Sequence, residues 1–239
     1  MLKGLGAAVA VVALGLLVYF QGVPLFASAV LPFVPESWDR KMGEMALDHL
    51  APEKDRYDGG KWGKQAAEMA AKLMPGGGAS RFRVVFVHTK MVNAFALPGN
   101  TIVVCEGLLN TIRKPGELAG ILAHEFQHGL GRHPTRFLVE QATLGTLSTV
   151  LFGDVSGLAA YGAQAAHLLG TLHYSRKLED SADHGAAVMM KAAGYAPADL
   201  GGWLRREAKG GKAMKYFKYL STHPDPETRA RNMAVESGN

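Results

Sequence analysis

Two histidines and the glutamate between them are the residues in this sequence that most clearly imply chemistry. The segment His124-Glu-Phe-Gln-His128 places the histidines four residues apart. On a helix both imidazoles project from one face, one turn apart, and two such nitrogens can bind one Zn²⁺. Glu125 follows the first histidine and can take a proton from an attacking water and pass it to a leaving amine. The spacing therefore predicts a hydrolytic site with one Zn²⁺ per chain.

The residues around this segment predict the helix that the two histidines need. Pro115 suits the first position of a helix, and Glu117 suits the positive end of its dipole. The apolar side chains that follow recur at helical spacing and are Leu118, Ile121, Leu122 and Phe126. A helix with this apolar side belongs in a core, where polar residues need a reason to be present. This context favours a metal site over a chance match on a surface helix.

A third protein ligand is needed, and two placements compete. In one pattern a third histidine follows Gly131 by three residues, but that position holds Pro134, and His133 is one residue short. In the other, a downstream helix supplies Glu179 as the ligand. Asp183, one turn later, would then accept a hydrogen bond from a ligand histidine and fix its tautomer. We favour the second placement over a solvated acidic helix face, and His133 is a further candidate for supporting the site.

The N-terminal region has the pattern of a membrane segment. No charged side chain occurs from Leu5 to Phe20, and residues 4–23 just reach the length of about 20 residues that spans a bilayer core. Lys3 favours a cytoplasmic start, with the remainder across the membrane. Ala27-Ser-Ala29 resembles a signal-peptidase site, and a buried core helix is the third alternative. We expect an anchor or signal segment over residues 1–34, preferably uncleaved, and one domain over residues 35–239.

The rest of the chain divides into helices that flank a small sheet. Arg81 to His88 alternates and is rich in Val and Phe, which indicates a strand. Asn93 to Val104 predicts a strand, a tight turn and a second strand, with Asn100 in the left-handed conformation that such a turn often needs. Pro52 to Gly60 is interpreted as a loop, and Pro197 to Asn239 as a tail. Helices are expected over residues 35–51, 61–74, 115–130, 138–173 and 174–193, which indicates a mostly helical α+β fold.

Composition excludes some classes of function. The chain has 26 basic and 21 acidic residues, a formal net charge of +5. So small a surplus, with no nucleic-acid-binding motif, predicts no nucleic-acid partner and fits weak attraction to anionic lipid head groups. Cys105 is the only cysteine, so intramolecular disulfides are excluded. It lies in an apolar run that indicates a strand, and we interpret it as a small buried hydrophobe.

Several ordered segments carry a family resemblance. They are His124 to His128, Tyr174-Ser-Arg176 with Glu179 to Asp183, Asn93-Ala-Phe-Ala-Leu-Pro-Gly99, Gly107-Leu-Leu109, and Ser221-Thr-His-Pro224 followed by Arg229. Together they resemble the HtpX/BepA/Oma type of gluzincin, which are membrane-associated metalloendopeptidases of protein quality control related to the CAAX prenyl proteases. The resemblance runs from about Pro35 to Met233. Asn100 stands where a second glycine is usual in this family.

The resemblance implies a zincin-like metallopeptidase domain and roles for individual residues. Glu125 would be the catalytic base, and the zinc ligands would be His124, His128 and Glu179. His223 would lie near the metal, either steadying the oxyanion or occupying the open site in a latent state. The helical-repeat domain of BepA-like members is not expected after His223.

Substrate binding is less clearly indicated. The strand that begins with Asn93, Ala94 and Phe95 could pair with an extended polypeptide substrate, or it could be an internal strand of the sheet. Residues 140–173 are nearly free of charge, and we favour an amphipathic cover over the active-site helix, with core packing or a mobile lid as alternatives. The lysines spaced by three from Lys209 to Lys218 indicate a solvated helix face or a contact with lipid head groups.

These observations predict a membrane-anchored zinc metalloendopeptidase that cleaves membrane or envelope proteins, in protein quality control. The expected location is a bacterial-type inner membrane, with one membrane crossing and a periplasmic catalytic domain, or a soluble periplasmic form if the N-terminus is cleaved. Polypeptides and membrane lipid are the expected partners, and the oligomeric state is left open. The alternatives are an inactive chaperone-like binding protein and a CAAX-type prenyl protease. Glu125 argues against the first, because binding needs no general base, and a single clear membrane segment argues against the second.

Overall fold

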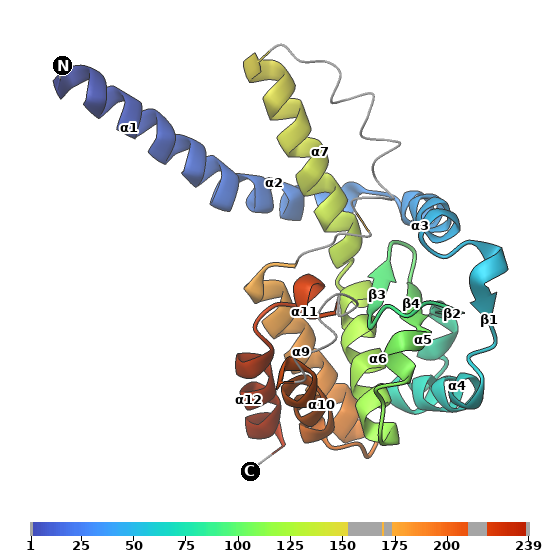
Figure 1. The fold of residues 1–239 in the computed structure, drawn as a ribbon. Helices are drawn as coiled ribbons and strands as arrows, with labels where there is room; N and C mark the ends of the chain where they lie inside the picture. The colour runs from blue at the N-terminus through green and yellow to red at the C-terminus, as the bar shows by residue number, and fades with distance from the viewer. Residues whose placement is uncertain (1, 153–168, 170–173, 210–218, 238–239) are drawn as a thin grey trace.

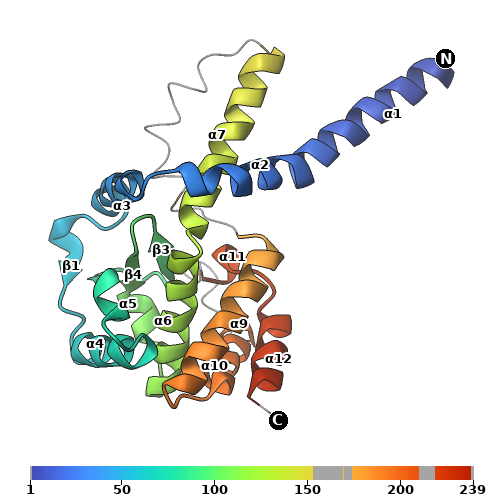
Figure 2. The same cartoon turned by 180° about the vertical axis from the view of Figure 1, so that it is seen from behind.

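The computed structural model describes residues 2–152, 169, 174–209 and 219–237, and it confirms the α+β fold (Figures 1 and 2). A small sheet lies at one side of a group of helices, and an apolar N-terminal helix extends away from both. The helices are α3 (Glu36–Leu50), α4 (Lys61–Leu73), α5 (Glu106–Leu109), α6 (Pro115–Leu130), α7 (His133–Phe152), α9 (Arg176–Ala192), α10 (Pro197–Lys209), α11 (Tyr219–Thr222) and α12 (Pro226–Glu236). Short 3₁₀ turns cover Glu53–Asp55 and Gly78–Arg81.

The N-terminal helix is a series of joined helical segments with an apolar surface. It comprises α1 (Leu2–Leu17), a π-helical stretch (Val18–Gly22), α2 (Val23–Val30) and a 3₁₀ turn (Leu31–Phe33). Within the described part of the chain, one helix, Val9–Phe33, is long and apolar enough to cross a membrane, with a mean hydropathy of 2.1 and only 6% of its most apolar stretch buried. The apolar surface is therefore not used to build the core of the domain.

The sheet has four strands in the order β1 (Arg56–Tyr57), β2 (Arg83–Val87), β4 (Thr101–Cys105) and β3 (Ala94–Leu97). β2 and β4 are parallel, and the other two pairs are antiparallel. The predicted tight turn joins β3 to β4, and Asn100 takes the predicted left-handed conformation with φ 64°. β1 lies within the stretch that was interpreted as a loop. That interpretation was wrong for two residues, because so short a strand carries no alternating pattern.

Helix positions agree with the sequence predictions in the first part of the domain and differ in the second. α3, α4, α6 and α9 lie within two residues of the predicted bounds. The helix predicted over 138–173 begins earlier, at His133, because Gly131 and Arg132 form a tight corner and Pro134 suits the first turn of a helix. Its described part ends at Phe152, so the expected cover over residues 140–173 lies mostly outside the described residues, as do the lysines between 212 and 218.

Beyond the helix face indicated by Lys209 to Lys218, no element was predicted in the tail after Pro197, and this was incomplete. The tail contains α10, α11 and α12, and α10 packs against both α6 and α12. Leu200, Trp203 and Leu204 are fully buried and recur at helical spacing. The spacing of these three apolar residues is thus a signal for α10 in the sequence.

Helix α6 passes through the middle of the domain and is buried along nearly its whole length (Figure 1). It packs against α4, α9, α10 and the sheet. Close approach depends on Gly120, where an added Cβ would lie 2.7 Å from the Cβ of Leu200. The predicted burial of Cys105 on β4 is confirmed, and burial raises the pKa of its thiol to about 12. The segment His124 to His128 therefore lies on a helix that is packed against both the sheet and other helices.

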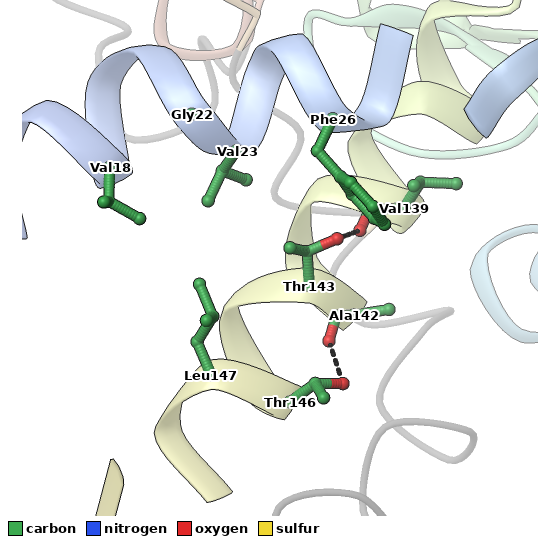
Figure 3. Close-up of a pocket in the computed structure, with 9 residues that line it drawn as sticks. All are labelled: Val18, Gly22, Val23, Phe26, Val139, Ala142, Thr143, Thr146 and Leu147. Carbon is green, nitrogen blue, oxygen red and sulfur yellow. Dashed lines mark hydrogen bonds between the residues drawn. The ribbon is translucent and has the colours of Figure 1, made fainter. Parts of the chain in front are cut away.

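An apolar cavity of about 620 Å³ separates part of the N-terminal helix from α7 (Figure 3). Its walls include Val18, Phe26 and Leu147, and the hydroxyls of Thr143 and Thr146 donate to carbonyl oxygens of their own helix. These hydroxyls therefore add little polarity to the cavity. The N-terminal helix and α7 lie close together at α2 and diverge from there in both views of the fold.

Candidate metal centre

Two histidines of α6 form the base of the candidate metal centre. His124 and His128 are fully buried and lie one turn apart on the helix. Their Nε2 atoms are 3.0 Å apart and face the same point. The helix begins at Pro115, as the sequence predicted, and tight packing on all sides fixes both rings.

Helix α9 brings the carboxylate of Glu179 to the two imidazoles. Ser175 caps this helix by accepting a hydrogen bond from the backbone N–H of Leu178, so that Glu179 lies in the first turn. The glutamate oxygens lie 3.5 Å from Nε2 of His124 and 3.4 Å from Nε2 of His128. α6 and α9 pack side by side, which brings together residues separated by more than 50 positions (Figure 1). The structure therefore places Glu179 where a third ligand would lie.

His223, which follows α11, completes the group. Its Nδ1 lies 3.0 Å from Oε1 of Glu179 and 3.2 Å from Nε2 of His124. One ligand atom from each of His124, His128, Glu179 and His223 lies within 4.8 Å of the others, and all four residues are buried. His223 thus lies within the cluster and not only beside it.

The chemistry of this group fits Zn²⁺. Three imidazoles and a carboxylate provide the nitrogen and oxygen donors that Zn²⁺ prefers, in the number that a tetrahedral site takes. Burial lowers the pKa of His128 well below its usual value, so this ring is neutral and can donate a lone pair. Burial opposes ionisation of Glu179, but His223 and the other two histidines hold the pKa of its carboxyl well below the usual range. No single group of the described residues can satisfy lone pairs that converge in this way. A bound cation would satisfy all of them.

Glu125 is buried beside the cluster without a hydrogen-bond partner. Both of its carboxylate oxygens and Nε2 of His223 are unsatisfied, and Oε1 lies 3.4 Å from that nitrogen. Burial raises the pKa of the Glu125 carboxyl. A buried carboxyl that accepts no hydrogen bond is costly in a core and marks a position where a proton can be exchanged with a bound molecule.

Each histidine of α6 has its own support on the ring nitrogen that faces away from the cluster. Oδ1 of Asp183 lies 2.8 Å from Nδ1 of His124. Burial and Arg229 disfavour protonation of this imidazole, but the Asp183 and Glu179 carboxylates raise its pKa to about 9. Nδ1 of His133 lies 2.9 Å from Nδ1 of His128. Burial lowers the pKa of His133 to about 4, so this support is neutral.

Three further residues, to which the sequence assigned no role, complete the site. Nε and Nη2 of Arg229 each donate to a different oxygen of Asp183 at 2.8 Å, and Nη1 lies 3.1 Å from Glu179. The ring of Tyr174 stacks on His128, and that of Tyr219 stacks on His223. Arg229 and Tyr174 stood in segments that carry the family resemblance, which was the only signal for them.

The strand proposed to bind substrate is an edge strand, since β3 ends the sheet. Asn93, Ala94 and Phe95 are nevertheless buried in this structure. Oγ1 of Thr222 lies 3.4 Å from Oδ1 of Asn93, which joins the start of the strand to the residue before His223. An extended polypeptide would therefore reach this strand only after the groups that cover it had moved.

Of the histidines that received no role, those in the described residues lie away from the cluster. His88 pairs with Glu106, and His184 pairs with Glu236, both at the surface. His49 is exposed on α3. His167 and His173 fall outside the described residues.

Comparisons with known proteins find relatives that are named as metalloendopeptidases or proteases. The chain is 33% identical to the mitochondrial metalloendopeptidase OMA1 of Arabidopsis thaliana over 154 residues. This aligned stretch covers 64% of this chain and 31% of that protein. The chain is 33% identical over 145 residues to the protein of the same name from Schizosaccharomyces pombe, 59% of this chain and 42% of that one. It is 30% identical over 167 residues to the beta-barrel assembly-enhancing protease of Yersinia pestis, 64% of this chain and 34% of that one. The chain thus spans between about a third and two fifths of the length of these relatives.

The match to a family covers most of the chain. Residues 62–236 match Peptidase family M48, and this stretch contains all four residues of the candidate metal-binding cluster and Glu125. The resemblance that the ordered motifs indicated is confirmed. The family uses zinc, which agrees with the donor set of the buried cluster. This chain belongs to Peptidase family M48, and its folded core is a zinc metallopeptidase domain of that family.

Proposed function

We propose that this protein is a membrane-anchored zinc metalloendopeptidase whose reaction centre is formed by His124, His128, Glu179 and Glu125. The single observation that carries this proposal is the convergence of three potential ligands beside a buried carboxyl that accepts no hydrogen bond. A binding protein of the same fold would not need Glu125 in that position. The buried Glu125 carboxyl, which accepts no hydrogen bond, therefore favours an enzyme over a chaperone-like protein.

The residues of the site have separate tasks in this proposal. Bound zinc would supply Lewis-acid chemistry, which polarises the scissile carbonyl and acidifies water. Glu125 accepts the proton of the attacking water and then delivers it to the amine that leaves. The raised pKa of its carboxyl suits both steps, because the group must take up and release a proton. Asp183 and His133 hold the two imidazoles in the tautomer that exposes a lone pair on Nε2.

In the described arrangement the ring of His223 closes the candidate zinc site to substrate. Its ring lies in the fourth position of the cluster and is held by stacking on Tyr219. A peptide carbonyl and a water need that space. We propose that His223 leaves this position when substrate binds and then faces the oxyanion, so that both roles implied by the resemblance belong to one residue.

The proposed substrates are polypeptides of the membrane or the envelope, cleaved in protein quality control. Two relatives are named as a mitochondrial metalloendopeptidase and a protease that enhances assembly of beta-barrels, and both names support polypeptide substrates. β3, with Asn93, Ala94 and Phe95 at its start, is the proposed docking strand once it is uncovered.

The N-terminal helix is the proposed anchor and the contact with lipid. Its exposed side chains include Phe20, Leu25 and Phe26, and the apolar cavity beside α7 continues this surface (Figure 3). The proposed arrangement is one crossing of a bacterial-type inner membrane with residues 35–239 on the periplasmic side, because Lys3 favours a cytoplasmic start. A topology reporter fused after Asn239 tests it, and a cytoplasmic signal would exclude it.

The decisive experiment replaces Glu125 by glutamine. Casein degradation should fall by about 10²–10⁴-fold, because the proton carrier is lost, whereas zinc content should stay at one ion per chain. The matched control is Glu140→Gln, which makes the same chemical change on α7, where Glu140 pairs with Arg136. Wild-type activity should also disappear with a chelator and return with zinc. A Glu125→Gln protein as active as wild type would contradict the proposed role of Glu125 as the proton carrier.

A further inference from the structure

The corner between α6 and α7 contains an arginine in a conformation that normally favours glycine. Arg132 has φ 51°, in the left-handed region, and is one of three described non-glycine residues with positive φ. This conformation brings the Cβ of an L-residue close to its own backbone. The chain turns here, between the end of α6 at Leu130 and the start of α7 at His133. A glycine would make this turn without strain, so the arginine side chain needs a separate reason to be here.

The side chain of Arg132 makes hydrogen bonds with the base of the N-terminal helix. Its Nη1 donates to the carbonyl oxygen of Leu31 at 3.1 Å, and its Nη2 donates to that of Val34 at 2.7 Å. Nε and Nη2 also donate to the two carboxylate oxygens of Asp39 on α3, at 2.7 and 3.0 Å. Asp39 is buried and also accepts from Thr135. Both sides of the guanidinium fork are therefore occupied.

The same corner positions the support of a proposed zinc ligand. His133 follows Arg132 directly, and its Nδ1 lies 2.9 Å from Nδ1 of His128. Because Nε2 of His128 faces the cluster, Nδ1 must carry the proton and donate to His133. On the other side of Arg132, a Cβ added to Gly131 would lie 2.4 Å from Nε2 of His133. The ring of His133 is thus set by the corner and fits closely against it.

We propose that Arg132 is a positioning residue that joins the base of the N-terminal helix to the metal-binding helix. It fixes the corner, the corner orients His133, and His133 orients His128. The membrane segment is then a structural part of the active-site support and not only a tether. This inference rests on the proposed function, because it takes His128 to be a zinc ligand.

Arg136 provides a matched comparison. It also ties α7 to the N-terminal helix, since its Nη2 donates to the carbonyl oxygen of Pro24 at 3.2 Å, and its Nε pairs with Glu140 at 2.9 Å. No contact of Arg136 reaches the described residues of the cluster. Loss of this arginine removes a link to the N-terminal helix and one positive charge near His133, but it breaks no hydrogen bond of that ring and leaves the backbone of the corner unchanged. Differences between the two arginines therefore isolate the path through the corner.

The test uses the full chain in detergent and compares Arg132→Gly, Gly131→Ala and Arg136→Ala with the wild type. Zinc affinity, measured by competition with a chelator, should fall by about 10-fold or more in the first two variants and stay within about twofold in the third. The visible absorption of the Co²⁺-loaded protein should change in the same two variants, because it reports the geometry of the ligands. In peptide cleavage, kcat should fall more than KM changes.

The variants separate a positioning role from a folding role. Arg132→Gly removes the side chain but relieves the backbone, whereas Gly131→Ala keeps Arg132 paired with Asp39 and displaces His133 from the other side. Arg132→Lys keeps the charge and loses the fork, so its zinc affinity should lie between those of Arg132→Gly and the wild type. Unchanged zinc affinity and Co²⁺ spectrum in a folded Arg132→Gly protein would overturn the inference. A wild-type chain that binds no zinc would instead overturn the proposed function.

Discussion

The two histidines of α6 lie one turn apart on one helix, yet the groups behind them differ in kind. Behind His124 stands a charged network, in which Asp183 is held by two hydrogen bonds from Arg229. Behind His128 stands a second imidazole, His133, which is neutral at physiological pH. The first support lies among helices of the domain, α9 and α12. The second leads out of the domain toward the N-terminal helix.

The difference shows how one site can be both rigid and adjustable. A fully buried ion pair is strongly directional, and removing one partner leaves an uncompensated charge in the core. A hydrogen bond between two neutral rings contributes less and can be broken at a lower cost. The charged side therefore fixes His124 and Glu179 with the fold itself. The neutral side makes His128 responsive to the proposed path through the corner at Arg132 to the N-terminal helix.

The largest effect is expected from removing Arg229, the positive charge in the network behind His124. Arg229→Met should destabilise the zinc-free protein by about 3–5 kcal/mol, because Asp183 and Glu179 would keep buried charge without their partner. Denaturant unfolding in the presence of a chelator measures this. The control is Arg231→Met, an exposed change on the same helix, which should stay within about 0.5 kcal/mol. If the two variants unfolded at the same denaturant concentration, the buried network would not stabilise the fold.

A smaller effect is expected when the charge of Asp183 alone is removed. Asp183→Asn keeps an oxygen that can accept from Nδ1 of His124 but makes that imidazole a weaker ligand, so zinc affinity should fall by roughly 10–100-fold. Chelator competition measures the affinity. Asp180→Asn, on an exposed face of the same helix, is the control. An affinity equal to wild type would mean that the charge behind His124 does not matter to the metal.

The smallest effect is expected on the neutral side. His133→Leu should lower zinc affinity by about 10-fold, because Nδ1 of His128 loses its acceptor, with a loss of unfolding free energy of only about 1 kcal/mol. His133→Asn restores an acceptor near the same position and should recover part of the affinity. His184→Leu, at the surface of α9, controls for the loss of a histidine. If His133→Leu destabilised the fold as much as Arg229→Met, the contrast between the two supports would disappear.

Local patterns in the sequence predicted the elements nearest the site. The apolar spacing after Pro115 predicted α6 with its observed bounds, and Asn100 predicted the left-handed turn between β3 and β4. Two-residue β1 and the start of α7 at His133 were missed. β1 is a strand because it pairs with β2, and α7 starts at His133 because the chain turns sharply at Arg132. Neither cause leaves a repeating pattern in a short stretch of residues.

Sequence by itself determined the two imidazoles of the centre, because a spacing of four on a helix is a local property that 3.6 residues per turn dictates. It also determined that the N-terminal stretch is apolar enough to cross a membrane. Only the tertiary structure decided that Glu179 and His223, 55 and 99 positions after His124, lie within reach of it. The tertiary structure alone also brought Arg229 into hydrogen bonds with Asp183, and Arg132 into a hydrogen bond with the carbonyl oxygen of Leu31. Such pairs depend on how helices pack, and packing is set by surfaces that are complementary only after the whole chain has folded.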